Sequence, residues 1–270
     1  MPNFLPTLRQ IRNFHLIKLT IMKTIYLTLL LFVSGLVTVQ AQSADEIIDA
    51  YHEVIGGKEK LKAIKGIKMS GKVNQGGLEI PVDVYQMADG KTMTVINFQG
   101  MTIYQGVFDG ETLWGTNFQT MQAEKSDAEA TENLKRNAMD FPDAFMDYAS
   151  KGYTVELVGQ ETFEGTDAHK IKLTKSPMLV DGEEVANISF YFFDTETGVL
   201  LGTEAEAKSG PMAGQVSMTV VTDYDEVDGL YFPFTMSTGI KGGAMQAISF
   251  ESIELNPEVE ASAFTFPAGN

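Results

Sequence analysis

The sequence predicts an α+β fold that is mainly β, with antiparallel strands that follow one another in chain order. Three observations lead to this class. An amphipathic helical pattern follows Ser43, stretches of alternating apolar and polar residues come after it, and Gly-containing turn signals recur between those stretches. A stretch of helical composition, from about Ala123 to Tyr148, interrupts the alternation. The predicted layout is therefore a helix, a first set of strands, a helical insert and a second set of strands.

The first helix has clear boundaries in the sequence. Ser43 is followed three residues later by Glu46, which is the pattern of a capping box, and Gly56-Gly57 ends the helix. A short second helix follows, up to about Gly66. The apolar residues of the first helix recur on one face, at Ile47, Tyr51, Val54 and Ile55.

The strands are predicted from period-two alternation and from turns. We expect about ten antiparallel strands in meander order. Asp-Gly between alternating stretches is among the strongest hairpin signals. The alternation is regular at Leu78, Ile80, Val82 and Val84, and Asp-Gly occurs at Asp89-Gly90, Asp109-Gly110, Asp181-Gly182 and Asp228-Gly229.

One hairpin combines an acidic turn with an aromatic strand. Asp228-Gly229 separates two strands, and the second carries Leu230, Phe232, Phe234 and Met236 on one face. In the strand before the turn, Met218 and Val220 share a face with Val216 and Tyr224. A calcium loop does not fit this stretch, because Val227 and Phe234 occupy positions where such a loop needs oxygen ligands. The acids therefore belong to a solvated turn.

The N-terminus predicts export. Lys23 precedes an apolar stretch that runs from Thr24 to Val39, and Val39-Gln40-Ala41 offers small residues before a cut near Ala41. A membrane anchor is the alternative, but the apolar stretch is shorter than the roughly 20 residues needed to span a bilayer. Residues 1–21 are not needed by a signal peptide at 22–41, which indicates a start codon assigned too early. We expect the mature chain, 42–270, to be a single exported domain.

The charge and the side-chain inventory exclude several functions. The chain has 36 acidic and 20 basic residues, and from Gln42 onward 16 basic residues remain, for a net charge of −20. Such a chain is repelled by nucleic acid and by anionic lipid surfaces. Cysteine is absent, and the scattered His52 and His169 form no metal motif. We therefore expect no catalytic residues, no metal and no cofactor.

Apolar side chains remain as the candidates for function. Trp114 is the single tryptophan, and Phe118 follows it closely. Phe190 and Phe192 lie in a strand that is apolar on both faces and so needs a covering layer. Each of these residues has two interpretations, ordinary core packing or the wall of an apolar cavity. Composition alone does not separate them.

Six stretches between about residues 43 and 255 resemble a known family. In chain order they are SADEIIDAYHEVIGGKEKLKAIKGIKMSGK, FDGETLWGTN, FPDAFMDYASKGY, FEGTDAHKIKLTK, YFFDTETGVL and YDEVDGLYFPF. Together they resemble the outer-membrane lipoprotein-sorting proteins, which are LolA/LolB-like, in the version common in Bacteroidota. Each stretch alone consists of turn and packing residues, and their order and spacing carry the resemblance.

The resemblance implies a strongly curved antiparallel sheet, an unclosed half-barrel, with helices over its concave face. It implies a non-enzymatic periplasmic protein that holds lipid or lipoprotein acyl chains between sheet and helices. An inner-membrane release complex or an outer-membrane acceptor would be its partner, and we expect a monomer. The cavity or lid residues would be Trp114, Phe118, Phe141, Phe145, Met146, Phe190, Phe192, Met218, Val220, Leu230, Phe232, Phe234 and Met236.

One departure and three alternatives accompany this prediction. Carriers of the family close the lid with an arginine on the sheet, whereas Arg136, in the insert, is the single arginine after Gln42. One alternative is an envelope-stress sensor or protein-binding module of the same fold. The second is a hydrolase that acts on a bound lipid. The third is a closed lipocalin-type barrel, which the helical insert disfavours.

Overall fold

The structure, a computed structural model, describes residues 42–267. The predicted signal peptide at 22–41 and the residues before it lie outside the described residues. From Ser43 onward the chain forms one compact unit.

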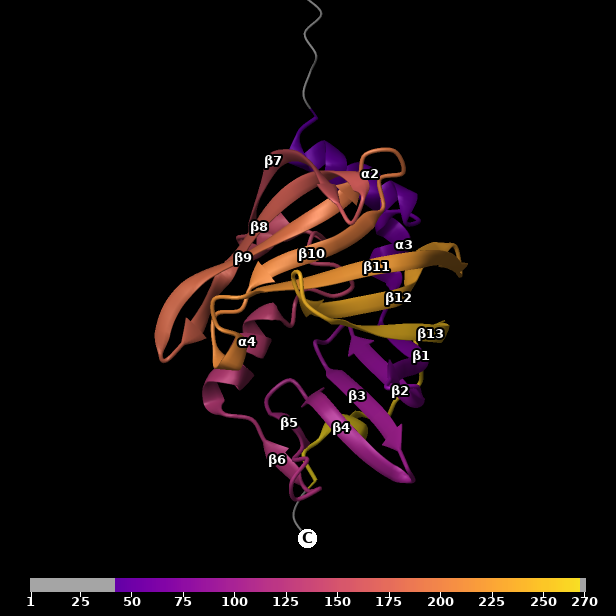
Figure 1. The fold of residues 1–270 in the computed structure, drawn as a ribbon, viewed down its shortest axis with the longest axis vertical. Helices are drawn as coiled ribbons and strands as arrows, with labels where there is room; N and C mark the ends of the chain where they lie inside the picture. Colours follow the sequence, from indigo (N-terminus) through magenta and orange to yellow (C-terminus); the bar gives the residue numbers. More distant parts are fainter. Residues whose placement is uncertain (1–41, 268–270) are drawn as a thin grey trace, which may run out of the picture. The chain divides into compact units, whose positions relative to one another are not determined.

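Thirteen antiparallel strands within 42–267 form one sheet, in the order β6-β5-β4-β3-β2-β1-β13-β12-β11-β10-β9-β8-β7 (Figure 1). In that part of the chain β6 and β7 are the two edges and do not pair with each other, so the sheet curves without closing. The mainly β, half-barrel prediction is confirmed, with thirteen strands in place of about ten. The strands are β1 (Gly66–Gln75), β2 (Leu78–Met87), β3 (Thr92–Phe98), β4 (Met101–Phe108), β5 (Leu113–Thr116), β6 (Ala123–Lys125), β7 (Thr154–Phe163), β8 (Thr166–Val180), β9 (Glu183–Asp194), β10 (Leu200–Glu206), β11 (Val216–Val227), β12 (Leu230–Ile240) and β13 (Met245–Leu255).

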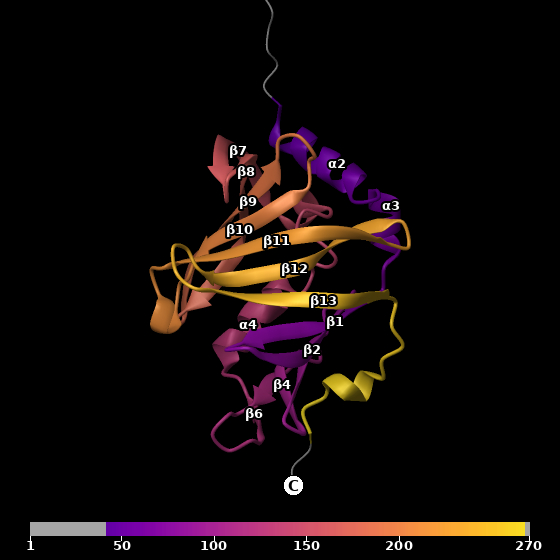
Figure 2. The same cartoon turned by 45° about the vertical axis from the view of Figure 1, so that its right-hand side comes forward.

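One strand pair breaks the simple meander. β1 pairs with β13, so the first and last strands lie side by side in the middle of the sheet (Figure 2). The two sets of strands on either side of the insert therefore join into one surface. The register of this pair shifts between Ser70 and Gly71. A side chain at Gly71 would meet the carbonyl oxygen of Ser249 at 2.3 Å, so the close approach of the two strands requires glycine here.

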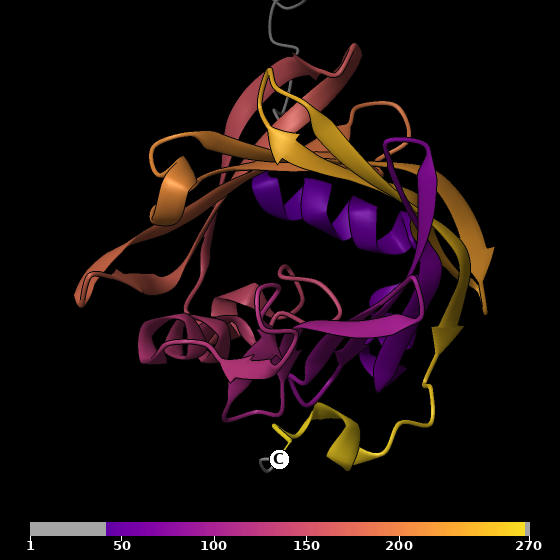
Figure 3. The ribbon, with the colours of Figure 1, turned by 60° about the horizontal axis from the view of Figure 1, so that its bottom comes forward.

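Three α-helices accompany the sheet in the described range. The predicted capping box of α2 (Ala44–Val54) is confirmed, because Glu46 N–H donates to Ser43 Oγ and Ser43 N–H donates to Glu46 Oε2. Figure 3 shows α2 inside the curve of the sheet. The others are α3 (Lys58–Ala63), α4 (Ala128–Asn137) and the 3₁₀ helices η1 (Tyr148–Lys151), η2 (Gly210–Met212) and η3 (Ala261–Phe264).

The insert is less helical than its composition predicts. Its start is the short strand β6, and α4 begins at an Asp127 N-cap and ends before Met139. The stretch from Phe141 to Asp147 contains turns, and only η1 adds helical backbone after it. Pro142 explains the break, because proline does not continue a helix. α4 contacts β8 and β5, strands from the two ends of the sheet.

The largest core cluster lies between α2, the insert and the concave face of the sheet. Ile47, Ile48 and Tyr51 of α2 pack there against β-strand residues such as Ile171 and Phe193, all of them buried. The helix is amphipathic because its apolar residues recur every three or four positions, and those residues meet the sheet. Two smaller clusters lie elsewhere, one around Trp114 and one around Phe192.

Candidate functional site

An apolar groove lies on the concave face, on strands that α2 does not cover. It has a volume of about 590 Å³ and opens to solvent. Volumes of about 300–1,000 Å³ with mostly apolar walls are typical of small-molecule sites. The strands β1, β2, β3, β4 and β13 form its walls, and the loop between β5 and β6 forms one rim. Its lining residues are Val73, Gln75, Ile80, Val82, Thr94, Ile96, Phe98, Met101, Ile103, Phe118, Met121, Gln246 and Ile248.

Strand register explains why these side chains meet. Residues that face each other on neighbouring strands share one side of a sheet. One row crosses the sheet as Ile248 opposite Val73 and Val73 opposite Ile80. A second row runs from Val82 to Ile96 and on to Ile103. The two rows form a continuous apolar floor, whose deepest residues, Val82 and Ile103, are buried.

The groove is a continuation of the core under α2. Ile67 and Met69, at the start of β1, pack in the α2 cluster, whereas Val73 and Gln75, at the end of the same strand, line the groove. All four lie on one face because they alternate along β1. The start of β1 therefore packs against the cluster that contains α2, and the end of the strand is left open.

The rim of the groove exposes large apolar side chains. Phe118 is 65% exposed, and Leu78, Met101 and Met121 are each more than 40% exposed. Leu78 and Met101 begin strands at hairpin turns, and Phe118 and Met121 lie in the loop that links β5 to β6. Clustered exposed apolar side chains around a concave site mark a binding surface more often than scattered ones do.

The structure divides the thirteen predicted site residues among four places. Phe118 lines the groove. Met236 lies beside it, because Met236 is opposite the groove residue Ile248. The largest group belongs to or packs against the α2 cluster: Phe141, Phe145, Met146, Leu230, Phe232 and Phe234.

The remaining five predicted residues lie in the two smaller clusters. Phe190, Phe192, Met218 and Val220 pack together, with the Phe192 ring stacked on that of Phe163 at 4.2 Å. Val220 is opposite Ser237, next to Met236, so this cluster lies on the other face of the sheet from the groove. Trp114 is buried, and its indole N–H donates to the Phe264 carbonyl at 2.9 Å. Met93 of the same cluster adjoins Thr94 of the groove and so lies on the opposite face.

The groove residues that the sequence analysis did not select come mainly from the first set of strands. Ile80 and Val82 were recognised there as an alternating pair, but not as part of a site. Ile96, Ile103 and Ile248 complete the floor. Their signal in the sequence is the ordinary alternation of a half-buried strand, which is the same for a packed face and for an open one.

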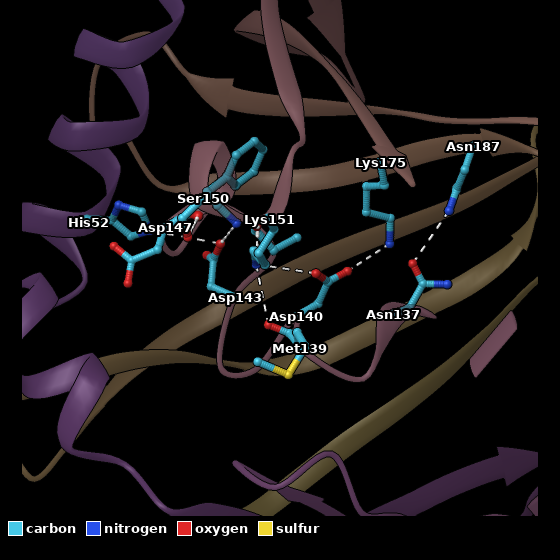
Figure 4. Close-up of polar contacts among 12 residues, drawn as sticks. His52, Asn137, Met139, Asp140, Asp143, Asp147, Ser150, Lys151, Lys175 and Asn187 are labelled. Atoms are coloured by element: carbon cyan, nitrogen blue, oxygen red, sulfur yellow. Dashed lines mark hydrogen bonds and ion pairs between the residues drawn. The ribbon is translucent and has the colours of Figure 1, made fainter. Parts of the chain in front are cut away.

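Ionic contacts attach the insert to the sheet (Figure 4). The Asp140 carboxylate accepts from Lys175 Nζ at 2.9 Å and from Lys151 Nζ at 3.3 Å, and all three side chains are mostly buried. Lys151 also donates to the Ala144 carbonyl at 3.0 Å. Arg136, the single arginine after Gln42, donates to the Pro177 carbonyl at 2.8 Å and pairs with Glu184. Lysines and Arg136 together therefore connect the insert to β8 and β9.

α2 carries a buried polar side chain. His52 is fully buried, and its Nε2 lies 3.9 Å from Asp143 Oδ1. Its ring nitrogens have no hydrogen-bond partner among the described residues. Burial raises the pKa of Tyr51 well above its usual value, and the nearby Asp143 carboxylate adds to this. Burial also raises the pKa of Tyr191 and Tyr224, again with a contribution from Asp143.

The described residues contain no group of three or more His, Asp or Glu side chains placed to hold a metal ion. Within the same part of the chain, no helix is both long and apolar enough to cross a membrane. The lining of the groove is apolar except for two amides and one hydroxyl.

Comparison with known proteins supports the fold. No protein-family model matches the chain, and no curated protein matches it in sequence. Among solved structures, a LolA superfamily protein from Nitrosomonas europaea matches with a TM-score of 0.51 at 13% identity, covering 83% of this chain and 98% of that one. A DUF1329 family protein from Desulfovibrio piger matches with a TM-score of 0.50 at 13% identity, covering 82% and 96%. The chain therefore has the fold that the resemblance predicted.

Proposed function

We propose that this protein is a non-enzymatic carrier that binds the acyl chains of a lipid or a lipoprotein in the concave groove. The observation that carries the proposal is the groove itself, with ten apolar residues among its thirteen lining residues. Moving apolar surface out of water into such a site is favourable by roughly 25 cal/mol per Å². The fold that this chain shares with a LolA superfamily protein also supports the proposal.

The finer part of the proposal concerns place and partners. A signal peptide at 22–41 would export the protein to the periplasm, where it would take acylated lipoproteins from an inner-membrane release complex to an outer-membrane acceptor. The net charge of −20 from Gln42 onward would keep the loaded carrier away from anionic membrane surfaces. An envelope-stress sensor of the same fold would bind a protein partner and would need no lipid.

Native mass spectrometry tests the proposal. Residues 42–270, exported to a periplasm and purified without detergent, should carry extra mass that organic extraction removes and that proves to be lipid or acylated peptide. A bare polypeptide mass, unchanged after incubation with lipid and with an acylated peptide, would contradict the carrier function and favour the sensor.

Two variants locate the site. Thr94→Trp places a bulky ring in the groove and should reduce the bound lipid at least about tenfold, since filling the site removes most of the apolar contact. Met121→Glu, at the rim, should also weaken binding. The matched control is Met212→Glu, because Met212 is similarly exposed, at 51%, and does not line the groove. Equal losses in Met121→Glu and Met212→Glu would place the lipid elsewhere.

A further inference from the structure

The two glutamines that line the groove lie at one end of it, whereas the third polar lining residue, Thr94, lies on β3. Gln75 ends β1 and Gln246 is near the start of β13, where the chain makes hairpin turns. Both are exposed, whereas the floor residues Val82 and Ile103 are buried. The groove therefore runs from a buried apolar floor to a solvent-facing mouth that carries two amides.

The register places the two amides on the same side of the sheet. Val73 is opposite Ile248 in this antiparallel pair; Gln75 follows Val73 by two positions, and Gln246 precedes Ile248 by two. Residues two apart in a strand share a face. Neither side-chain amide is hydrogen-bonded to another residue of the described chain. Each amide offers both an N–H donor and a carbonyl acceptor.

The lysine side chains near the mouth of the groove, Lys72 and Lys241, are paired with carboxylates. Lys72, which precedes Val73 and so points to the other face, lies 2.8 Å from Glu251 and 3.4 Å from Glu79. Lys241, in the turn before β13, lies 2.6 Å from the buried Glu204. Glu204 is opposite Met218, on the face away from the groove. An anionic group at the mouth would therefore meet two neutral amides on a chain of net charge −16.

We infer that the groove selects chains whose head group is uncharged and hydrogen-bonding, such as an ester or an amide, over carboxylate or phosphate heads. This inference rests on the proposed function and adds the chemical class of the head group to it. The acyl chain would lie on the floor from Val82 to Ile103. An ester or amide carbonyl of the head would accept from the side-chain N–H groups of Gln75 and Gln246 at the mouth, and an amide N–H would also donate to their carbonyl oxygens.

The test compares two ligands that share one chain. N-dodecanoyl ethanolamine and dodecanoic acid carry the same alkyl chain, and at neutral pH only the acid is charged. Isothermal titration at concentrations below micelle formation should show the ethanolamide binding at least about tenfold more tightly. Replacing both amides, Gln75→Ala with Gln246→Ala, should weaken ethanolamide binding by about three- to tenfold, the amount expected for one or two hydrogen bonds.

A charge-gain variant provides the reverse test. Gln246→Lys should tighten the binding of dodecanoic acid, and should therefore reduce or invert the preference for N-dodecanoyl ethanolamine over the acid. Gln160→Lys is its matched control, because Gln160 is an exposed glutamine on β7, the far edge of the sheet. It introduces the same charge away from the groove and should leave the preference unchanged.

The outcomes separate this inference from the carrier function. Equal binding of the two ligands, unaffected by Gln246→Lys but abolished by Thr94→Trp, would overturn the head-group inference and leave the carrier in place. No binding of either ligand to the unaltered protein would overturn both. Circular dichroism checks that each variant is folded. Gln75 and Gln246 are exposed, so we expect their replacement to leave the fold intact.

Discussion

Tyr148 connects two segments that are far apart in the chain. Its hydroxyl donates to the Asp45 carboxylate at the start of α2, across 103 positions of sequence. Partial burial, with a further contribution from Asp45, raises the pKa of Tyr148 to about 12. Burial, together with Asp140, raises the pKa of Tyr153 to about 12 as well. Both phenols are therefore neutral in the folded protein at pH values where an unfolded chain begins to ionise them.

We expect the protein to lose stability in alkali. An unfolded tyrosine has a pKa of about 10, so between pH about 10 and 12 the unfolded state binds fewer protons than the folded one. The stabilisation is fully present below pH about 10 and is lost as the pH rises through the folded pKa. Urea unfolding at pH about 9 and about 11 measures this. The drop should be smaller in Tyr148→Phe, and an identical drop would contradict the role of this tyrosine.

At the scale of single elements, Asp140 joins the insert to β8. It pairs with Lys151 and Lys175, whose side chains are only 13% and 15% exposed. Asp140→Ala leaves two mostly buried ammonium groups without their partner, so the free energy of unfolding should fall by about 3 kcal/mol. Urea denaturation measures the change.

An exposed ion pair serves as the control for Asp140. Asp49 and Lys58 form a contact in which the two side chains are 63% and 40% exposed. Because water screens such a pair, Asp49→Ala should cost at most about 1 kcal/mol. Similar losses in the two variants would show that the Asp140 contacts do not hold the insert in place.

Local patterns explain why the elements could be predicted from sequence. The Ser43–Glu46 capping box requires only residues within one helical turn, and the Asp-Gly turns at Asp181 and Asp228 require only a backbone with positive φ, here 54° and 52°. The insert was predicted less well. Its helical composition extends past Pro142, but there Phe145 and Met146 pack into the core cluster and the backbone forms turns.

The site could be predicted only in part, because its location depends on the whole sheet. Phe232 and Phe234 have the same alternating signal as Ile96 and Ile103. The first two meet α2 or its cluster and the last two line the groove. The pairing of β1 with β13 decides which strands adjoin which, and no local pattern encodes it. Trp114 illustrates the same limit, since its partner Phe264 lies 150 positions away.

At the scale of the whole molecule, the groove follows from a difference in length. α2 has 11 residues and so spans about 16 Å. Thirteen strands at about 4.8 Å spacing form a much wider surface. One short helix and the insert can therefore cover only part of the concave face. They fill it with side chains at one end, where Phe145 and Phe193 are in contact at 5.6 Å between ring centroids. The other end stays open.

Because the concave face has a filled part under α2 and an open groove, we can predict where a bound ligand changes hydrogen exchange. If the acyl chain enters the groove, hydrogen exchange should slow at the groove-lining ends of the strands, in residues 94–103 and 245–248, and in the loop that contains Phe118 and Met121. Exchange in α2, residues 44–54, should stay unchanged, because its core cluster is already filled by Ile48, Tyr51 and their partners. Exchange mass spectrometry with and without N-dodecanoyl ethanolamine measures both regions. Faster exchange in α2 on binding would mean that the helix lifts to admit the chain, and that the space beneath it, rather than the open groove, is the site.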